Sequence, residues 1–176
     1  MVHIGSFSKT LSASARCGFI AARRDWIEGL IDLKIATTFG GGRLTAELVY
    51  NVLRDGSYRK HMERLRVRLA HAMTEVGGRL KPLGIKPWLE PHAGMLLWCR
   101  LPDDIDAAEI AKAALAQDIV LAPGNVFSVS QSMPSFLRFN ASQSLDNRVF
   151  DFLKTSIHRY GKPGARTSQS ATSIGT

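Results

Sequence analysis

The chain has 176 residues, of which 45% are hydrophobic and 22% are charged. This composition is ordinary for a soluble globular protein, and the length suffices to bury a core. No apolar run reaches the length of a membrane span, and no signal-peptide pattern opens the chain. The two cysteines, Cys17 and Cys99, are too few and too far apart for a disulfide framework or a metal site. We therefore predict a cytoplasmic protein without a membrane partner or a metal.

The formal net charge is +8, and basic residues gather between Arg54 and Arg79 and again from Arg159 onward. A basic balance can favour binding to nucleic acid. A charge run is more often a solvated helix face, and no helix-turn-helix pattern is evident. We therefore expect contact with DNA only through a domain that is not present in this chain.

The first part of the chain combines two short strands with helices. Residues 2–4 and 18–22 are apolar and flank a loop rich in serine. Two strands do not form a stable sheet by themselves, so these two are expected to belong to a larger sheet. The spacing of apolar residues predicts helices over 25–35 and 44–53.

A long helix is predicted from Ser57, which can cap it. Its apolar residues alternate in steps of four and three, and its other face is arginine and lysine. Gly77-Gly78 is expected to fray or kink this helix. Tyr58, His61 and the more distant Trp88 are expected to be packing residues.

The second part of the chain alternates between strands and helices. The predicted elements are a central strand at 94–101, a helix at 106–117, a short strand at 119–121, a strand at 136–141 and a helix at 146–160. Asp106 is predicted to cap its helix in a capping box with Glu109. The alternation indicates an α/β fold. We expect a large-domain remnant at 1–56, an interdomain helix at 57–78, a small α/β domain at 79–160 and a disordered tail at 161–176, which is rich in Gly, Ser and Thr.

The first strand leads into a group of residues suited to a phosphate-bearing aldehyde. Ser6, Ser8, Lys9 and Arg16 fall within eleven residues. A lysine amine can form an imine with an aldehyde, while serines and an arginine can hold a phosphate. From spacing alone, a solvated loop lysine would be the favoured interpretation of Lys9.

Arg138 lies within an apolar stretch, with Phe136 and Asn140 on the same face of the predicted strand. A buried arginine needs a partner. Its planar fork suits a carboxylate, either that of a bound ligand or that of a structural acid. Asn140 itself is expected to be structural.

In order along the chain, five segments resemble fold-type-I aminotransferases of class I/II that depend on pyridoxal phosphate. They are GSFSKTLSASARCGFIA, LTAELVYNVLRDGSYRKHMERLR, EPHAGMLLWCRLP, VLAPGNVF and FLRFNAS. The resemblance is most specific to the aminotransferase-like domain of the MocR branch of GntR-type regulators. It implies the C-terminal part of that fold, comprising the edge of the large domain, the long interdomain helix and the small α/β domain.

The resemblance also implies roles for individual residues. Lys9 would form the internal aldimine with pyridoxal 5'-phosphate and then move the proton, which requires a neutral amine favoured by burial and by nearby Arg16. Ser6 and Arg16 would bind the phosphate, with Ser8 as a third donor. Arg138 would pair with the α-carboxylate of an amino acid or 2-oxo acid substrate. The family implies a homodimer.

Family residues that stack on the cofactor ring and pair with its nitrogen lie before the lysine, so the chain is expected to be a C-terminal fragment. Three functions remain open at this point. The chain could be part of an aminotransferase, the effector part of a regulator that binds the cofactor as a ligand, or an inactive α/β module.

Overall fold

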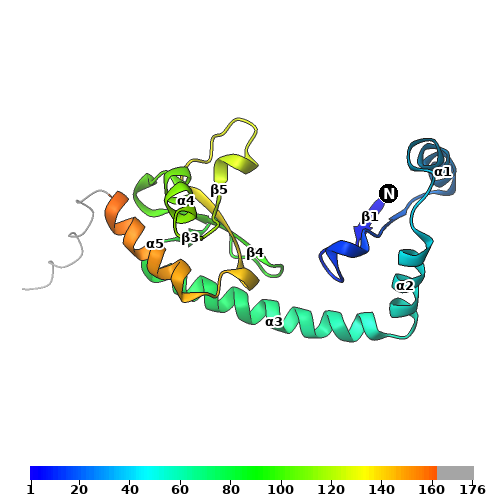
Figure 1. The fold of residues 1–176 in the computed structure, drawn as a ribbon, viewed down its shortest axis with the longest axis horizontal. Helices are drawn as coiled ribbons and strands as arrows, with labels where there is room; N and C mark the ends of the chain where they lie inside the picture. The colour runs from blue at the N-terminus through cyan, green and yellow to red at the C-terminus, as the bar shows by residue number, and fades with distance from the viewer. Residues whose placement is uncertain (162–176) are drawn as a thin grey trace, which may run out of the picture. The chain divides into compact units, whose positions relative to one another are not determined.

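A computed structural model of the chain describes residues 1–161 (Figure 1). The strands are β1 His3–Ser6, β2 Gly18–Ala21, β3 Lys86–Pro87, β4 Leu96–Arg100, β5 Ala122–Pro123 and β6 Phe136–Asn140. The α-helices are α1 Arg24–Thr38, α2 Arg43–Arg54, α3 Ser57–Leu80, α4 Ala107–Leu115 and α5 Asn147–Tyr160, and short 3-10 turns η1–η5 connect several elements. The mixed α/β class is confirmed. The tail predicted to be disordered lies outside the described residues except for its first glycine.

The chain divides into two compact units, Met1–Arg66 and a second that begins at Val67. In the first unit, β1 and β2 form an antiparallel hairpin in which Ser6 lies opposite Gly18. A Cβ atom at Gly18 would lie 2.7 Å from the Gly5 carbonyl oxygen, so this close approach of the two strands requires glycine. Both strands were correctly predicted. Neither is covered by a second layer, because three of four β1 residues and all of β2 are exposed.

The second unit is built on a four-stranded antiparallel sheet with the strand order β3-β4-β6-β5. The prediction that 94–101 contains a central strand is confirmed, since β4 pairs with both β3 and β6. The predicted strand at 119–121 is wrong in position. Ile119 and Leu121 pack against the core, whereas the ladder with β6 forms two residues later, at β5.

Alternation along β4 and β6 separates a core face of the sheet from an aromatic face. Leu97, Cys99, Leu137 and Phe139 point into the core, and each is at most 4% exposed. The core is completed by side chains of α3, α4, α5 and the loops between them: Ala72, Val76, Leu80, Ile85, Leu101, Ile105, Ala107, Ile110, Ala114, Ile119, Ala141, Phe150, Phe152 and Leu153. This one cluster accounts for most buried apolar side chains, whereas the first unit buries only Phe7 and Val49. The second unit therefore contains the hydrophobic core.

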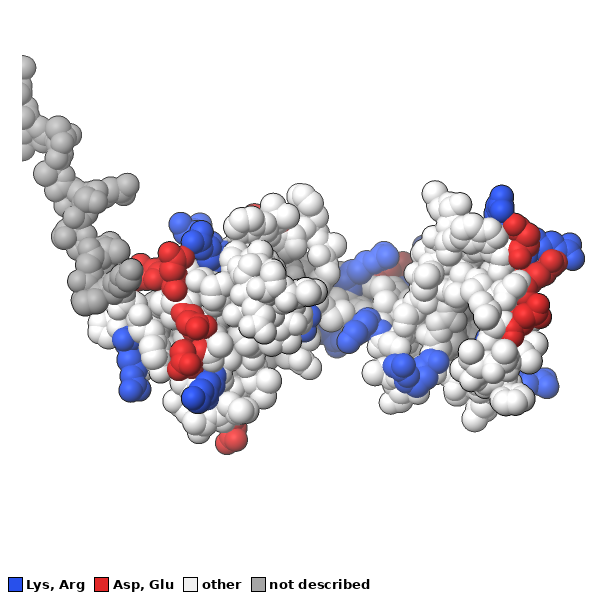
Figure 2. All heavy atoms as spheres, turned by 90° about the horizontal axis from the view of Figure 1, so that it is seen from above, with Lys and Arg blue, Asp and Glu red and all other residues white. Residues whose placement is uncertain are grey.

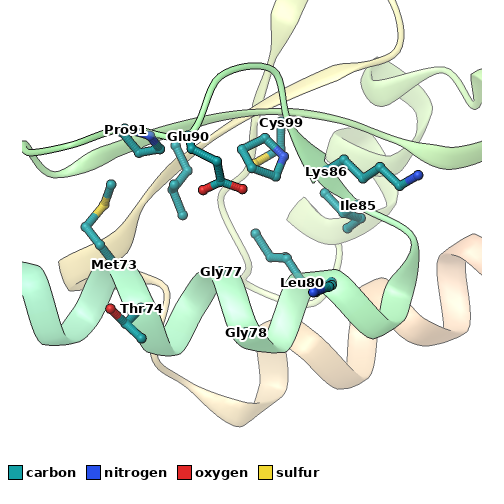
Figure 3. A pocket seen from close by; sticks show the side chains of 13 residues that line it. Met73, Thr74, Gly77, Gly78, Leu80, Ile85, Lys86, Glu90, Pro91 and Cys99 are labelled. Carbon is teal, nitrogen blue, oxygen red and sulfur yellow. The ribbon is translucent and has the colours of Figure 1, made fainter.

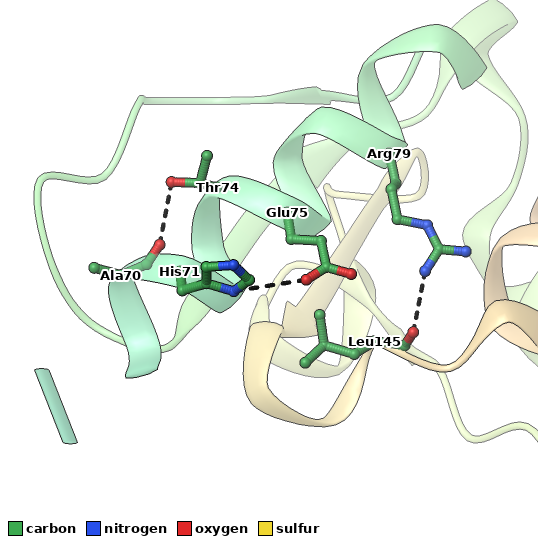
Figure 4. A network of polar contacts seen from close by, with 6 residues as sticks. All are labelled: Ala70, His71, Thr74, Glu75, Arg79 and Leu145. Atoms are coloured by element: carbon green, nitrogen blue, oxygen red, sulfur yellow. Dashed lines mark hydrogen bonds and ion pairs between the residues drawn. The ribbon is translucent and has the colours of Figure 1, made fainter. Parts of the chain in front are cut away.

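Polar contacts from α3 hold the loop that leads into α5 (Figure 4). The Arg79 guanidinium donates to the Leu145 carbonyl at 3.0 Å and to the Asn147 side chain at 2.8 Å. It also lies 3.7 Å from the centroid of the Phe150 ring. On the same helix, His71 lies 3.7 Å from Glu75, an exposed contact that contributes little. Arg79 thus adds polar and cation–π contacts to the core packing that joins α5 to α3.

The helix starts follow the predicted caps in one case and not in the other. Asp106 accepts a hydrogen bond from the Ala108 amide and caps α4, as predicted, but within residues 1–161 no hydrogen bond from the Asp106 amide to the Glu109 side chain completes the predicted capping box. Ser57 is already helical, and the cap comes from Asp55, which accepts from the Ser57 amide at 2.8 Å. The hydrogen bonds from Ser57 lower the pKa of the Asp55 carboxyl.

Charged side chains on the helices pair locally. Arg24, Arg43 and Arg59 each contact a glutamate one turn later on the same helix. On the face shown in Figure 2, acidic side chains lie beside basic ones and large areas of each unit are uncharged. Of these pairs, Arg59–Glu63 lies in the basic run between Arg54 and Arg79, and its exposed side chains are typical of a solvated helix face.

The expected fraying or kink at Gly77-Gly78 is wrong. Helix α3 continues through both glycines to Leu80, which is 1% exposed in the core. Neither glycine has a positive φ, and a Cβ atom at either would meet nothing within 4 Å. Burial of Val76 and Leu80 on one side holds the helix together and offsets the weak helix propensity of glycine.

Replacing Gly77 by alanine is therefore expected to stabilise the second unit by about 0.5–1 kcal/mol, because alanine loses less backbone entropy in a helix. Thermal unfolding followed by circular dichroism measures the change. Gly84→Ala is the matched control with the opposite sign. Gly84 has a φ of +75°, and its added Cβ would lie 3.3 Å from Pro102. A Gly77→Ala protein no more stable than wild type would contradict the argument.

Candidate active site

Lys9 lies in a tight loop at the end of the β1–β2 hairpin. The Phe7 amide donates to the Cys17 carbonyl at 3.0 Å and extends the ladder by one step beyond Ser6. The Phe7 carbonyl then accepts from the amides of Leu11 and Ser12, at 2.8 and 3.2 Å. These bonds close the backbone over residues 7–12 and present Lys9 at the top of the hairpin.

The predicted phosphate donors lie at the same end of this hairpin. The Ser6 hydroxyl accepts a hydrogen bond from the Ser8 amide at 3.2 Å, which places these residues side by side. Arg16 ends a 3-10 turn and has a φ of 44°. It lies two residues before Gly18, which pairs with Ser6 in the hairpin, so Arg16 lies at the same end of the hairpin as Ser6. Within residues 1–161 the Arg16 guanidinium forms no ion pair. The structure thus brings Ser6, Ser8, Lys9 and Arg16 to one loop and leaves the cation available for an anion.

The burial expected for Lys9 is not found. Lys9, Ser6 and Arg16 are all exposed, and Ser8 is half-buried. The cause lies in the hairpin, because β1 and β2 have no layer packed over them in the first unit. The chain as described therefore does not desolvate the Lys9 amine.

Two residues at the start of α3 hold the segment that follows Lys9. The Tyr58 hydroxyl donates to the Thr10 hydroxyl at 2.9 Å, and a ring nitrogen of His61 lies 2.8 Å from the Thr10 carbonyl oxygen. The Tyr58 ring also packs edge-on against Phe7, with ring centroids 5.7 Å apart. Packing was predicted for both helix residues, but their hydrogen bonds to Thr10 were missed. Their spacing of three residues on one helix face was the available signal.

Arg138 lies on the aromatic face of the second unit's sheet, in β6 between Trp98 of β4 and Ala122 of β5. Its guanidinium carbon lies 3.9 Å from the centroid of the Phe127 ring. Trp98 stacks on Phe136 at 5.2 Å and packs edge-on against Phe127 at 5.9 Å. The Phe127 ring thus holds the guanidinium from one side, and Trp98 packs against Phe127.

No acidic side chain among residues 1–161 pairs with Arg138. The interpretation of Arg138 as the partner of a structural acid therefore has no support in the described part of the chain. A half-buried arginine with free donors is suited to bind a carboxylate from outside the protein.

The residues of the Lys9 loop fit pyridoxal 5'-phosphate chemically. They supply one primary amine for an aldehyde, and two hydroxyls and a guanidinium for a phosphate, with no carboxylate on the same loop to repel the anion. No group of three metal-ligating side chains occurs in residues 1–161. In the same range, no helix is both long enough and apolar enough to cross a membrane.

Comparison with known proteins identifies the family of the chain. The family model for aminotransferase class I and II matches residues 1–152. Among curated proteins, the HTH-type transcriptional regulator NorG of Staphylococcus aureus strain USA300 is 29% identical over 154 residues, covering 85% of this chain and 35% of NorG. The uncharacterized HTH-type transcriptional regulator YdcR of Escherichia coli K12 is 30% identical over 145 residues, covering 81% of this chain and 31% of YdcR. The chain thus spans about a third of the length of these relatives.

Solved aminotransferases share the fold. The α-aminoadipate aminotransferase LysN of Thermus thermophilus superposes with a TM-score of 0.78 at 23% identity, covering 90% of this chain and 42% of LysN. An aromatic aminotransferase from Pyrococcus horikoshii gives a TM-score of 0.79 at 17% identity, covering 90% of this chain and 43% of that one. The chain has the C-terminal part of the fold of fold-type-I aminotransferases, and it belongs to the aminotransferase class I and II family.

Proposed function

We propose that this chain contributes the lysine, phosphate and carboxylate sites of a pyridoxal-phosphate-dependent aminotransferase, which transfers an amino group between an amino acid and a 2-oxo acid. The observation that carries the proposal is the one hairpin end that carries Ser6, Ser8, Lys9 and Arg16. The family match supports the same chemistry.

Each residue has a distinct task in this proposal. The amine of Lys9 holds the cofactor and afterwards moves the proton at the substrate α-carbon. Ser6, Ser8 and Arg16 bind the phosphate, and the hydrogen bonds of Tyr58 and His61 to Thr10 hold the loop in place. Arg138, with its guanidinium held from one side by Phe127, binds the substrate carboxylate. Pyridoxal 5'-phosphate supplies the electron sink that stabilises the deprotonated α-carbon.

A second function is favoured by one specific observation. The curated relatives NorG and YdcR are described as transcriptional regulators, not as enzymes. In that case the same residues would bind the cofactor and an amino acid as effectors, and DNA would be bound by a domain outside this chain. Both functions predict a cytoplasmic homodimer. The exposed apolar side chains of α1 and α2 would favour association of two copies of the chain.

Borohydride reduction of the purified chain with pyridoxal 5'-phosphate, followed by peptide mass mapping, tests the shared cofactor site. We expect one dominant adduct, on Lys9, that is absent from Lys9→Ala and unchanged in Lys34→Ala, which removes an exposed lysine of α1. Arg16→Ala should weaken cofactor affinity about 10-fold to 100-fold, since a hydrogen bond to a charged group contributes roughly 1.5–3 kcal/mol.

Adducts scattered over many lysines, or none, would overturn the proposal and leave an inactive α/β module. If Lys9 is labelled, incubation with amino acids separates the two functions. Conversion of the bound cofactor to its amine form, followed by absorbance, supports the aminotransferase, whereas unchanged cofactor with bound amino acid supports the effector role.

A further inference from the structure

The second unit contains a cavity of about 580 Å³ between α3 and the β3–β4 part of the sheet (Figure 3). Its walls are mainly apolar and include Met73, Leu80, Ile85, Leu97 and the Cys99 thiol. Pockets that bind small molecules in proteins have volumes of roughly 300–1,000 Å³ and mostly apolar walls with a few polar groups. This cavity shares no residue with the Lys9 loop or with the surroundings of Arg138.

Two glycines on α3 form one side of the cavity. Gly77 and Gly78 both line it, and a Cβ atom at either would meet nothing within 4 Å. Neither glycine has a positive φ, so the backbone does not require glycine at these positions. Each glycine costs the helix roughly 0.5–1 kcal/mol relative to alanine. Without side chains at these two positions, the backbone of α3 itself forms this wall of the cavity.

The charged residues that line the cavity are one carboxylate, that of the exposed Glu90, and two lysines, Lys81 and Lys86. Figure 3 shows the Glu90 side chain pointing from the loop after β3 toward the helix at Gly77, whereas Lys86 extends along the strand and away from it. Within residues 1–161 the Glu90 carboxylate forms no ion pair. Its negative charge reaches into the cavity, because it contributes to raising the pKa of the Cys99 thiol at the back.

We propose that this cavity is a binding site for a small organic cation with an apolar body, whose ammonium group pairs with Glu90 while its apolar part fills the space over Gly77 and Gly78. Complementary charge next to an apolar wall selects such a molecule over a neutral or anionic one of the same shape. Since none of its lining residues belongs to the Lys9 loop or contacts Arg138, we take its occupant to be distinct from the amino acid of the proposed function.

Phenethylammonium tests the site in the 176-residue chain without added pyridoxal phosphate, with 2-phenylethanol and 3-phenylpropanoate as neutral and anionic analogues. Titration followed by ¹H–¹⁵N spectra is expected to shift the amides of Gly77, Gly78 and Cys99, with at least about 10-fold weaker binding of both analogues. Glu90→Gln should weaken phenethylammonium binding about 10-fold. Gly77→Leu should abolish binding by filling the space.

Glu109→Gln is the matched control, because it removes the same charge from an exposed position on α4 outside the cavity and should bind like wild type. Tighter binding of 3-phenylpropanoate would overturn the proposal in favour of a site governed by Lys81 and Lys86. Shifts confined to other residues, undiminished binding by Glu90→Gln, or no binding would overturn it as well. None of these outcomes changes the labelling of Lys9, so failure here is distinguishable from failure of the proposed function.

Discussion

Replacing Leu137 by alanine is expected to destabilise the second unit by about 3 kcal/mol, near the middle of the range of roughly 2–5 kcal/mol for such core truncations. Leu137 is fully buried in β6, the strand between β4 and β5, and lies opposite Cys99 on one side and Pro123 on the other. Because hydrogen-bonded strands flank it on both sides, the backbone cannot close the cavity that the lost side chain leaves. The variant therefore loses both the transfer energy and the packing contacts of the removed isopropyl group.

Urea unfolding measures this effect if the fluorescence comes from the second unit alone. A Trp26→Phe background removes the tryptophan of the first unit and leaves Trp88 and Trp98 as reporters. Leu115→Ala is the matched control, since Leu115 is 64% exposed at the end of α4. Its truncation should cost well under about 1 kcal/mol. Equal midpoints for the two variants would show that the sheet and its helices do not form the core described above.

The second unit was more predictable from sequence than the first, for a physical reason. Its strands and helices bury one continuous core, so apolar periodicity in the sequence corresponds directly to packing. The predicted elements at 94–101, 136–141 and 146–160 are each found, with ends shifted by at most two residues. In the first unit the helices at 25–35 and 44–53 are also found, yet their apolar faces are largely exposed.

Two of the wrong predictions arose where local preference and tertiary packing disagree. Gly77-Gly78 is a weak helix pair, but the burial of Val76 and Leu80 beside it keeps α3 intact. At 119–121 the apolar residues do pack into the core, but β6 pairs with the chain two residues later. Apolar pattern alone reports burial and does not fix the register of a short strand.

The candidate site was predictable only where its residues are adjacent in sequence. Ser6, Ser8 and Lys9 lie in one loop, and a single turn brings Arg16 back to them. The contacts from Tyr58 and His61 to Thr10 join residues about fifty positions apart, so the spacing of the two residues on α3 indicates a shared helix face but not the segment that this face contacts. The exposure of Lys9 was missed because it depends on what covers the hairpin, which is a tertiary property.

The free energy of unfolding of the second unit is expected to fall as the pH rises above about 9, because of Cys99. Burial first, and the charge of Glu90 second, raise the pKa of this thiol from 9.0 to about 12. The unfolded chain then ionises near its ordinary pKa while the folded chain keeps its proton, so the unfolded state gains stability between about pH 9 and pH 12. The loss reaches at most about 1.4 kcal/mol per pH unit and is absent below about pH 9.

Urea unfolding at pH 7, 9, 10 and 11 measures the slope, with Cys99→Ala as the comparison. That variant starts less stable at pH 7 because it leaves a small cavity, but its stability should fall less steeply above pH 9, since other groups titrate equally in both proteins. Thiolate absorbance in a Cys17→Ser background measures the pKa of Cys99 directly. Glu90→Gln should lower this pKa while leaving it well above 9, because burial is the larger cause of the shift. Two outcomes would show that the thiol is open to water: ionisation of the native Cys99 thiol near pH 9, or parallel stability curves for wild type and Cys99→Ala. The back wall of the cavity beneath Glu90 would then be open to water as well.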